Sequence, residues 1–200
     1  WALHDGHHAA IVDPGDAAIV QAFLHVKNLT LTDILVTHHH ADHIGGIAAL
    51  QKTYSDVRIF GLSHSGLDCV THPVKENDHA QVLGLDFKVI QTPGHLSSHV
   101  SYVSHPLLFC GDTLFSAGCG RIFDGTPEQL FNSLNKLKAL PGDTQVYCAH
   151  EYTEANLKFA LHIEPGNTAV LNYMAHVKKL RAAGTPTIPT QLDIECAVNP

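Results

Sequence analysis

The sequence predicts an α/β fold in which two sheets are sandwiched between outer helices. Short apolar runs typical of strands alternate with segments of helical periodicity in both halves of the chain. Apolar residues make up 44% of the 200 residues, which is enough to bury the core of one substantial domain. No internal repeat of about 20 to 50 residues is visible, so a repeat architecture is not expected. Together these features favour layers of sheet and helix.

The first half of the chain begins with a strand and a capped helix. Ala9 to Val12 is a short apolar run that Asp13-Pro14-Gly15 closes as a turn. Asp16 can then cap a helix whose apolar residues recur at helical spacing. The elements expected next are a strand at 33–36, a helix around 44–50, a strand at 57–60, and successive strands at 82–90, 100–103 and 107–110.

The second half repeats the alternation. A helix is expected over 127–140, with Thr126 as its cap and proline at its first position. Pro141-Gly142 is expected to end it. The elements expected next are a strand at 144–148 and two helices, over 152–163 and 168–183. The tail from Gly184 is rich in proline and threonine, and its composition predicts a loop.

Charge, apolar runs and cysteines exclude several classes of protein. The net charge is -7 and no long run of Lys and Arg is present, which argues against a nucleic-acid surface. No apolar run approaches the roughly 20 residues that span a bilayer, so no membrane protein is expected. Five cysteines without C-x-x-C spacing indicate free thiols in a reducing compartment. We therefore expect a cytoplasmic protein, and we expect it to be a monomer.

A cluster of histidines follows the strand at 33–36 directly, in the segment Thr37 to His43. In extended backbone, residues two apart point to the same side, so His38, His40 and Asp42 are expected to share one face. His43 begins the next helix and can turn back toward the same space. The pattern predicts a metal site at the carboxyl end of a strand, where α/β sheets commonly place their sites.

Three further candidate ligands each follow a predicted strand: His95, Asp112 and His150. Each alone is more often structural than functional. Together with the first cluster they make five histidines and two aspartates, which is enough for two metal ions. Imidazole and carboxylate ligands suit zinc, iron or manganese without any thiolate. The sequence therefore predicts a centre with two divalent metal ions, with zinc as the first choice and iron or manganese as alternatives.

The order H-x-H-x-D-H, His, Asp, His resembles the metallo-β-lactamase superfamily from Ala10 to His150. The resemblance implies a four-layer αββα sandwich, with a catalytic domain over 1–151 and a C-terminal helical segment over 152–200. It also implies the ligands of two metal ions. One metal is held by His38, His40 and His95, and the second by Asp42, His43 and His150. Asp112 bridges the two metals together with a water-derived hydroxide.

Narrower phrases resemble the hydroxyacylglutathione hydrolases, also called glyoxalase II: Val12 to Gly15, Gly111 to Phe115, Cys119 to Arg121, His150 to Thr153, Asn156 to Pro165, and Asn199-Pro200. This family hydrolyses S-D-lactoylglutathione, a thioester made during methylglyoxal detoxification, to glutathione and D-lactate. The resemblance implies that the partner of this chain is such a small-molecule glutathione thioester. The expected catalytic residues are Asp112, which bridges the two metals together with the hydroxide, and Asp42, which is primarily a ligand but could accept a proton during turnover.

The same resemblance implies substrate contacts at Arg121, Phe123 and Tyr152. The alternatives are a solvated loop charge for Arg121 and a packing role for Tyr152. Leu96 departs from the family, which has threonine after the Pro-Gly-His phrase. The family also continues beyond Asn199-Pro200 with a segment whose basic residues bind glutathione, so we expect the C-terminal segment of this chain to be incomplete.

Two other classes of function stay open at this stage. On the same scaffold, the chain could be a lactonase, a β-lactamase or a persulfide dioxygenase with one iron. The complete second ligand set at Asp42, His43 and His150 weighs against the dioxygenase. The alternative outside enzymes is a metal-binding remnant without activity. Ligands dispersed over several strand ends weigh against a simple metal buffer, because buffers use clustered histidine tracts. A serine esterase is disfavoured because no G-x-S-x-G phrase is present.

Overall fold

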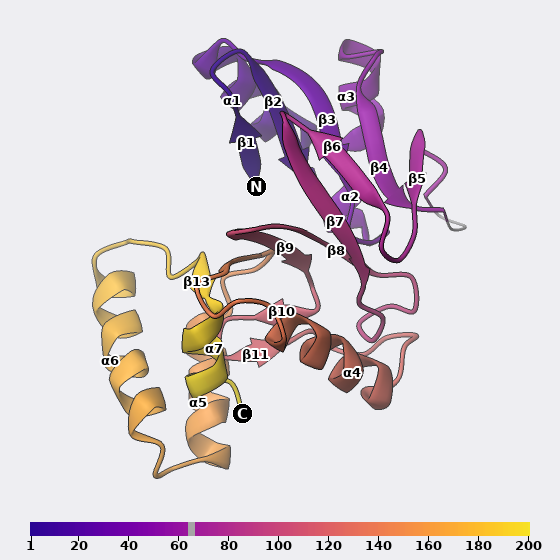
Figure 1. Cartoon of the computed structure of the whole chain (residues 1–200). Coiled ribbons are helices and arrows are strands. Elements are labelled where there is room, and N and C mark those ends of the chain that lie inside the picture. The colour runs from indigo at the N-terminus through magenta and orange to yellow at the C-terminus, as the bar shows by residue number, and fades with distance from the viewer. Residues whose placement is uncertain (64–66) are drawn as a thin grey trace. The chain divides into compact units, whose positions relative to one another are not determined.

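The computed structural model describes residues 1–63 and 67–200 (Figure 1). The chain divides into two compact units. Unit 1 comprises Trp1–Gln91 with Ser98–Ser104, and unit 2 comprises Thr92–Ser97 with His105–Pro200. The predicted boundary after residue 151 stays a prediction.

Unit 1 contains a five-stranded sheet with the order β1-β2-β3-β4-β5 (Figure 1). β1 runs antiparallel to β2, and the other neighbouring pairs are parallel. The strands are β1 (Ala2–His4), β2 (His8–Val12), β3 (Thr30–Leu35), β4 (Arg58–Leu62) and β5 (His72–Val74). The helices are α1 (Ala17–Lys27), α2 (Ala41–Ile44) and α3 (Ile47–Thr53). The predicted cap is confirmed, because the Asp16 carboxylate accepts the backbone N–H of Ala18 and of Ile19.

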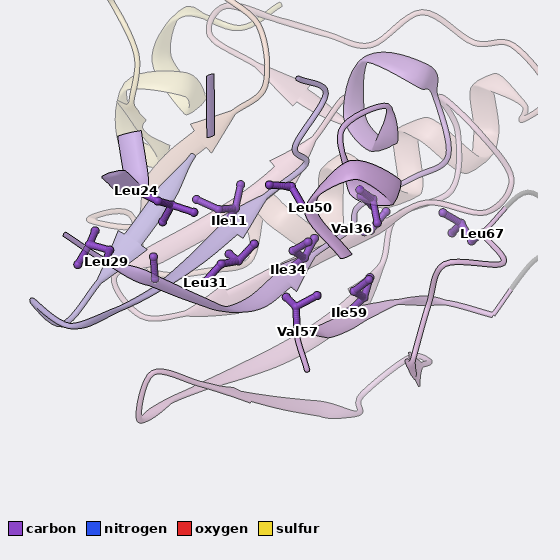
Figure 2. Close-up of a cluster of buried hydrophobic side chains, with 12 residues drawn as sticks. Ile11, Leu24, Leu29, Leu31, Ile34, Val36, Leu50, Val57, Ile59 and Leu67 are labelled. Atoms are coloured by element: carbon purple, nitrogen blue, oxygen red, sulfur yellow. The ribbon is translucent and has the colours of Figure 1, made fainter. Parts of the chain in front are cut away.

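The core of unit 1 lies between this sheet and helices α1 and α3 (Figure 2). Ile11, Ile34 and Ile59 are register partners on the three central strands, and all three belong to the cluster. Leu31 belongs to it as well, although strict alternation would turn residues three apart to opposite faces. The register between β2 and β3 shifts at Thr32, and this bulge lets Leu31 and Ile34 face the same helices.

Three antiparallel strands complete unit 1: β6 (His79–Val82), β7 (Leu85–Gln91) and β8 (Val100–Ser104). The prediction of one continuous strand over 82–90 is wrong, because a two-residue turn separates β6 from β7. Leu83 and Gly84 occupy the turn with φ of 50° and 77°. Both residues of such a hairpin turn need positive φ, which favours Asn-Gly. Leucine rarely adopts this conformation, so only Gly84 of the two turn residues indicates a hairpin in the sequence.

Unit 2 contains β9 (Leu107–Gly111), which runs parallel to β12 (Gln145–Cys148), and β13 (Thr190–Gln191), which pairs antiparallel with β12. A small hairpin is formed by β10 (Leu114–Phe115) and β11 (Gly118–Cys119). The helices are α4 (Pro127–Lys138), α5 (Thr153–Ile163), α6 (Thr168–Ala182) and α7 (Leu192–Val198). The predicted start of α4 is confirmed, because Thr126 and Gln129 form a reciprocal capping box ahead of it.

The tail of the chain is more ordered than its composition predicts. The expectation of a loop from Gly184 onward is wrong, because β13 and α7 lie within it. Val198 of α7 packs into a buried cluster with Leu157 of α5 and Val170 of α6, and α5 and α6 pack side by side (Figure 1). Tertiary contacts therefore override a composition that favours a loop. In the described part of the chain, no helix is both long and apolar enough to cross a membrane.

Candidate metal centre

The histidine cluster of unit 1 lies just beyond the sheet. β3 ends at Leu35, so Thr37 to His40 are not strand, and Asp42 and His43 belong to α2. The alternation argument for a shared face is therefore wrong in its premise. His38 and His43 are nevertheless buried, whereas the side chain of Asp42 is 62% exposed.

The side chains of this cluster still converge. The His38 Nε2 atom lies 3.1 Å from His40 Nδ1. The ring centroids of His38 and His43 are 4.0 Å apart. Asp42 Oδ2 lies 3.7 Å from His43 Nε2. Unit 1 by itself thus gathers three imidazoles and one carboxylate into one small volume.

Asp13, which was predicted only as part of a turn, organises this cluster. It follows β2, the parallel neighbour of β3, so the two strand ends lie at the same sheet edge. Its carboxylate accepts the backbone N–H of Thr37 at 2.8 Å and the Thr37 hydroxyl at 2.7 Å. The second of these oxygens also lies 3.0 Å from His43 Nδ1. Asp13 therefore orients the far side of His43, leaving Nε2 toward Asp42.

Close backbone contacts hold the turn after β2 against α2. A Cβ on Gly15 would lie 2.0 Å from the carbonyl oxygen of Asp42. A Cβ on Gly46 would lie 2.7 Å from the carbonyl oxygen of Pro14. Only glycine allows these approaches. The same Gly45-Gly46 pair separates α2 from α3, so the single helix predicted around residues 44–50 is two short helices.

His99 is a second residue that sequence reasoning missed. It is buried, and its ring stacks on that of His38 with centroids 4.9 Å apart and an interplanar angle of 26°. The backbone N–H of Val100 donates to the carbonyl of Thr37 at 2.9 Å, which ties this segment to the histidine cluster. No spacing in the sequence marks His99, because only the packing of β8 in unit 1 brings it to His38.

The three candidate ligands of unit 2 also converge. Asp112 follows β9 and His150 follows its parallel neighbour β12, so both lie at the carboxyl edge of the pair. Asp112 Oδ1 lies 3.4 Å from His150 Nε2, and Asp112 Oδ2 lies 3.6 Å from His95 Nε2. One carboxylate thus stands between two imidazoles. Asp112 and His95 are buried, whereas His150 is partly exposed.

The orientation of His95 is fixed by backbone. Its Nδ1 donates to the carbonyl of Arg121 at 2.6 Å, which leaves the Nε2 lone pair directed toward Asp112. The N–H of Phe123 donates to the His95 carbonyl at 3.0 Å. Gly120 makes this approach possible, because a Cβ there would lie 1.8 Å from the Asp112 carbonyl oxygen and 3.2 Å from His95 Nδ1.

The predicted substrate residues lie beside these ligands in unit 2. Tyr152 stacks on His150 with ring centroids 5.1 Å apart, and Phe115 meets the Tyr152 ring edge-on at 5.3 Å. The Arg121 guanidinium lies 5.2 Å from the Phe123 ring, which meets the His95 ring edge-on at 5.2 Å. Tyr152 and Phe123 are about half exposed, so both rings offer apolar surface next to the ligands.

A hollow of about 290 Å³ lies next to Tyr152, with Lys158 and Arg181 among its lining residues. Two cysteine thiols of unit 2, those of Cys110 and Cys148, are buried. Burial raises the pKa of Cys148 to about 12 and the pKa of Cys110 well above its usual value. Both thiols are therefore protonated at neutral pH, and neither acts as a nucleophile.

The residues fit divalent metal ions by their chemistry. Each offers an imidazole nitrogen or a carboxylate oxygen that can ligate a metal ion. Buried polar groups of this kind are costly unless they are paired or bind a metal. The set is His38, His40, Asp42, His43, His95, Asp112 and His150.

Comparison with known proteins identifies the fold and the family. The model of the metallo-beta-lactamase superfamily matches residues 1–61 and 72–150, and that of the hydroxyacylglutathione hydrolase C-terminus matches residues 151–200. Among solved structures, ETHE1 from Myxococcus xanthus is 34% identical with a TM-score of 0.68, covering 76% of this chain and 69% of that one. The B3 metallo-beta-lactamase BLEG-1 is 30% identical with a TM-score of 0.67, covering 74% and 84%. These similarities confirm the predicted fold class.

Curated relatives narrow the assignment. The hydroxyacylglutathione hydrolase of Vibrio parahaemolyticus is 50% identical over 201 residues, and that of Aliivibrio fischeri strain MJ11 is 48% identical over the same length. In both cases the match covers 100% of this chain and 80% of the relative. The chain therefore belongs to the metallo-β-lactamase superfamily and, within it, to the hydroxyacylglutathione hydrolase family.

Proposed function

We propose that this chain is a metal-dependent thioesterase that hydrolyses S-D-lactoylglutathione, a 2-hydroxyacyl thioester, to glutathione and D-lactate. The observation that carries the proposal is identity of 47 to 50% to named hydroxyacylglutathione hydrolases along the whole chain. The match of residues 151–200 to the C-terminal part of that family separates this reading from a β-lactamase or a lactonase on the same scaffold.

The centre proposed for this reaction holds two divalent metal ions, zinc in the first place and iron or manganese as alternatives. Family membership supports one set of His38, His40 and His95, a second set of Asp42, His43 and His150, and Asp112 shared by both. When bound, such ions act as Lewis acids and lower the pKa of water toward neutrality.

Within unit 1, His43 and Asp42 have different parts in this proposal. Asp13 holds the Nδ1 side of the buried His43, so that Nε2 stays available to a metal. Asp42 is the exposed member of the cluster, with its Oδ2 atom 3.7 Å from His43 Nε2. Its contact with solvent suits it to pass a proton from Oδ2 to water during turnover.

Within unit 2, one carboxylate and two aromatic rings define the reacting side. Asp112 faces His95 with one oxygen and His150 with the other, which keeps both imidazoles directed toward one point. Tyr152 and Phe123 provide rings against which the peptide-like part of glutathione can pack. Arg121 provides a guanidinium for one of its carboxylates. The thiolate of glutathione leaves with little need for a proton, since thiol pKa values lie near 8.5.

The setting proposed for this enzyme is the cytoplasm, where it acts as a monomer. None of the five cysteines, all of which lie in the described residues, forms a disulfide, which fits a reducing compartment. Gel filtration of the purified chain tests the oligomeric state, and elution at twice the mass of one chain contradicts the proposed monomer.

A thioester assay tests the function. Hydrolysis of S-D-lactoylglutathione is followed by loss of thioester absorbance for the native chain, His40→Ala and Asp112→Ala. The exposed His162→Ala serves as the control for loss of a histidine outside the cluster. We expect both site variants to lose at least about 100-fold in kcat/KM and the control to match the native chain. Native rates in both site variants, or faster hydrolysis of a β-lactam than of the thioester, contradict the proposal.

A further inference from the structure

The turn between β10 and β11 is buried, which is unusual for a hairpin turn. Phe115, Ser116 and Ala117 are at most 4% exposed. Ala117 also has a φ of +58°, a left-handed conformation that alanine rarely adopts. Turns normally lie at the surface because water satisfies their backbone groups. This turn must therefore find its hydrogen-bonding partners, and the contacts that maintain its conformation, elsewhere in the protein.

Asn156 of α5 donates to the carbonyl of Ser116 in the turn at 3.0 Å, and further partners of the turn come from the end of the chain. Glu195 of α7 accepts the backbone N–H of Ala117 on its Oε2 atom at 2.7 Å. Asn199 donates from Nδ2 to the carbonyl of Gly118 at 2.9 Å and to that of Phe115 at 3.3 Å. The same Nδ2 lies 3.2 Å from Glu195 Oε2, so the two side chains bind the turn as one pair.

Glu195 is itself buried, at 3% exposure, and is held from two sides. Its Oε1 atom accepts the hydroxyl of Thr190 at 2.8 Å, opposite the contacts on Oε2. Burial raises the pKa of this carboxyl, and the hydrogen bonds from Ala117, Thr190 and Asn199 offset part of that cost. A buried carboxyl that is this fully bonded to a turn fixes the position of the turn's backbone.

The turn connects to the candidate site on both of its sides. Before it, the Phe115 ring contacts the ring of Tyr152 at 5.3 Å and that of His150 at 5.8 Å. After the turn, β11 leads through Gly120 to Arg121, whose carbonyl accepts a hydrogen bond from His95 Nδ1. A shift of the turn would therefore move the packing of one candidate ligand and the hydrogen bond that orients another.

We propose that Glu195 is a positioning residue, which acts through the β10–β11 turn to set the orientation of His95, His150 and Tyr152. The proposal gives α7 a part in substrate binding that is exerted through the turn. Its kinetic consequence rests on the proposed function, because it takes Tyr152 and Arg121 as glutathione contacts.

Hydrogen exchange of residues 114–121 tests the structural step without any assay of activity. Glu195→Ala removes the acceptor for Ala117, and we expect the segment to exchange about tenfold faster or more. Glu195→Gln is expected to keep native exchange, because its amide can accept from Ala117 and donate to the Thr190 hydroxyl. Asp193→Ala is the control, since it removes an exposed carboxylate from the same helix.

Kinetics and metal content test the functional step on the same variants. We expect Glu195→Ala to raise KM for the thioester on the order of tenfold, with a smaller change in kcat, and to lose metal faster during dialysis against a weak chelator. Glu195→Gln and Asp193→Ala should match the native chain in both. If Glu195→Ala does not fold, Asn199→Ala is measured in its place and should shift exchange and KM in the same direction.

Native exchange over residues 114–121 together with native KM and metal retention in Glu195→Ala overturns the proposal. Faster exchange with unchanged KM and metal retention also overturns it, because the turn would then be a local anchor only. If the native chain does not hydrolyse the thioester at all, the proposed function fails, and exchange and metal retention still decide the role of Glu195.

Discussion

Replacement of Gly120 by alanine tests how closely the backbone of unit 2 surrounds its candidate ligands. The added Cβ would lie 1.8 Å from the Asp112 carbonyl oxygen, 3.0 Å from its carbonyl carbon and 3.2 Å from His95 Nδ1. Cβ contacts under 3.0 Å are essentially never observed, so the Asp112 backbone or residue 120 must move by more than about 1 Å. Because the two closest contacts are to the Asp112 backbone, rotation of a side chain cannot relieve them.

The expected magnitudes follow from that displacement. A misplacement of about 1 Å in a positioned group costs on the order of 100-fold in rate, so we expect kcat/KM for the thioester to fall at least that far. Insertion of a methyl group into a packed site also lowers the free energy of unfolding by about 1 to 3 kcal/mol. The assays are thioester hydrolysis, metal content and urea unfolding, each on the same preparation.

Gly166→Ala is the matched control, because nothing lies within 4 Å of the Cβ added there. It should retain native activity and metal content. The reasoning is refuted if Gly120→Ala hydrolyses the thioester at the native rate with native metal content, since His95 and Asp112 would then tolerate a displaced backbone.

The remaining predictions concern unit 1, the buried glutamate and the metals. Asp13→Asn should weaken zinc binding about 10- to 100-fold in a competition titration, because it loses the carboxylate beside His43, and unchanged affinity would contradict this role. Arg58→Met removes the ion pair that Arg58 forms with the buried Asp33 carboxylate at 2.5 Å, so it should lower the free energy of unfolding in a urea titration by about 3 kcal/mol. The control Lys88→Met, at an exposed position, should leave the free energy of unfolding nearly unchanged. Burial raises the pKa of Glu195 above its ordinary value of 4.5. Protonated Glu195 therefore stabilises the folded chain fully below pH 4.5, and this stabilisation is lost as the pH rises through the pKa of the folded state. Glu195→Gln should therefore gain stability relative to the native chain as the pH rises from 4.5 toward neutral, and a constant difference in urea midpoint would contradict it. Chelation should abolish activity and lower the thermal midpoint, and added zinc should restore both.

Where local signals agree, the sequence predicts the elements well. The helix predicted over 127–140 begins as expected, with a capping threonine and a proline at its first position, and it ends at Lys138, just before the predicted Pro-Gly stop. Asp16 caps α1 in the same way. These signals involve groups within a few residues of one another, so no tertiary information is needed to interpret them.

The predictions that were wrong have one local cause and one tertiary cause. Leu83 adopts positive φ because the hairpin of β6 and β7 requires it, and a leucine in the sequence does not predict that conformation. The tail forms β13 and α7 because β12 offers an edge for pairing and α5 and α6 offer an apolar surface. Partners on other elements of unit 2 decide both β13 and α7, and a local pattern cannot show them.

The candidate site shows the same division. The placement of Asp112 and His150 follows from a general rule, because the ends of adjacent parallel strands lie at one sheet edge. The same rule applied to β2 and β3 could have found Asp13. His99 could not have been found this way, since its stacking on His38 depends on how β8 packs within unit 1. The assignment of the seven residues as ligands stays a prediction.

Elemental analysis of the purified native chain, alongside Asp112→Ala, is the most direct test of the central claim that this chain is a hydrolase with two metal ions. We predict two divalent ions per native chain, with both lost or weakened in the variant because Asp112 is proposed to bind both. A native chain that hydrolyses the thioester at full rate while holding no metal, or a variant that keeps two ions, would contradict the account.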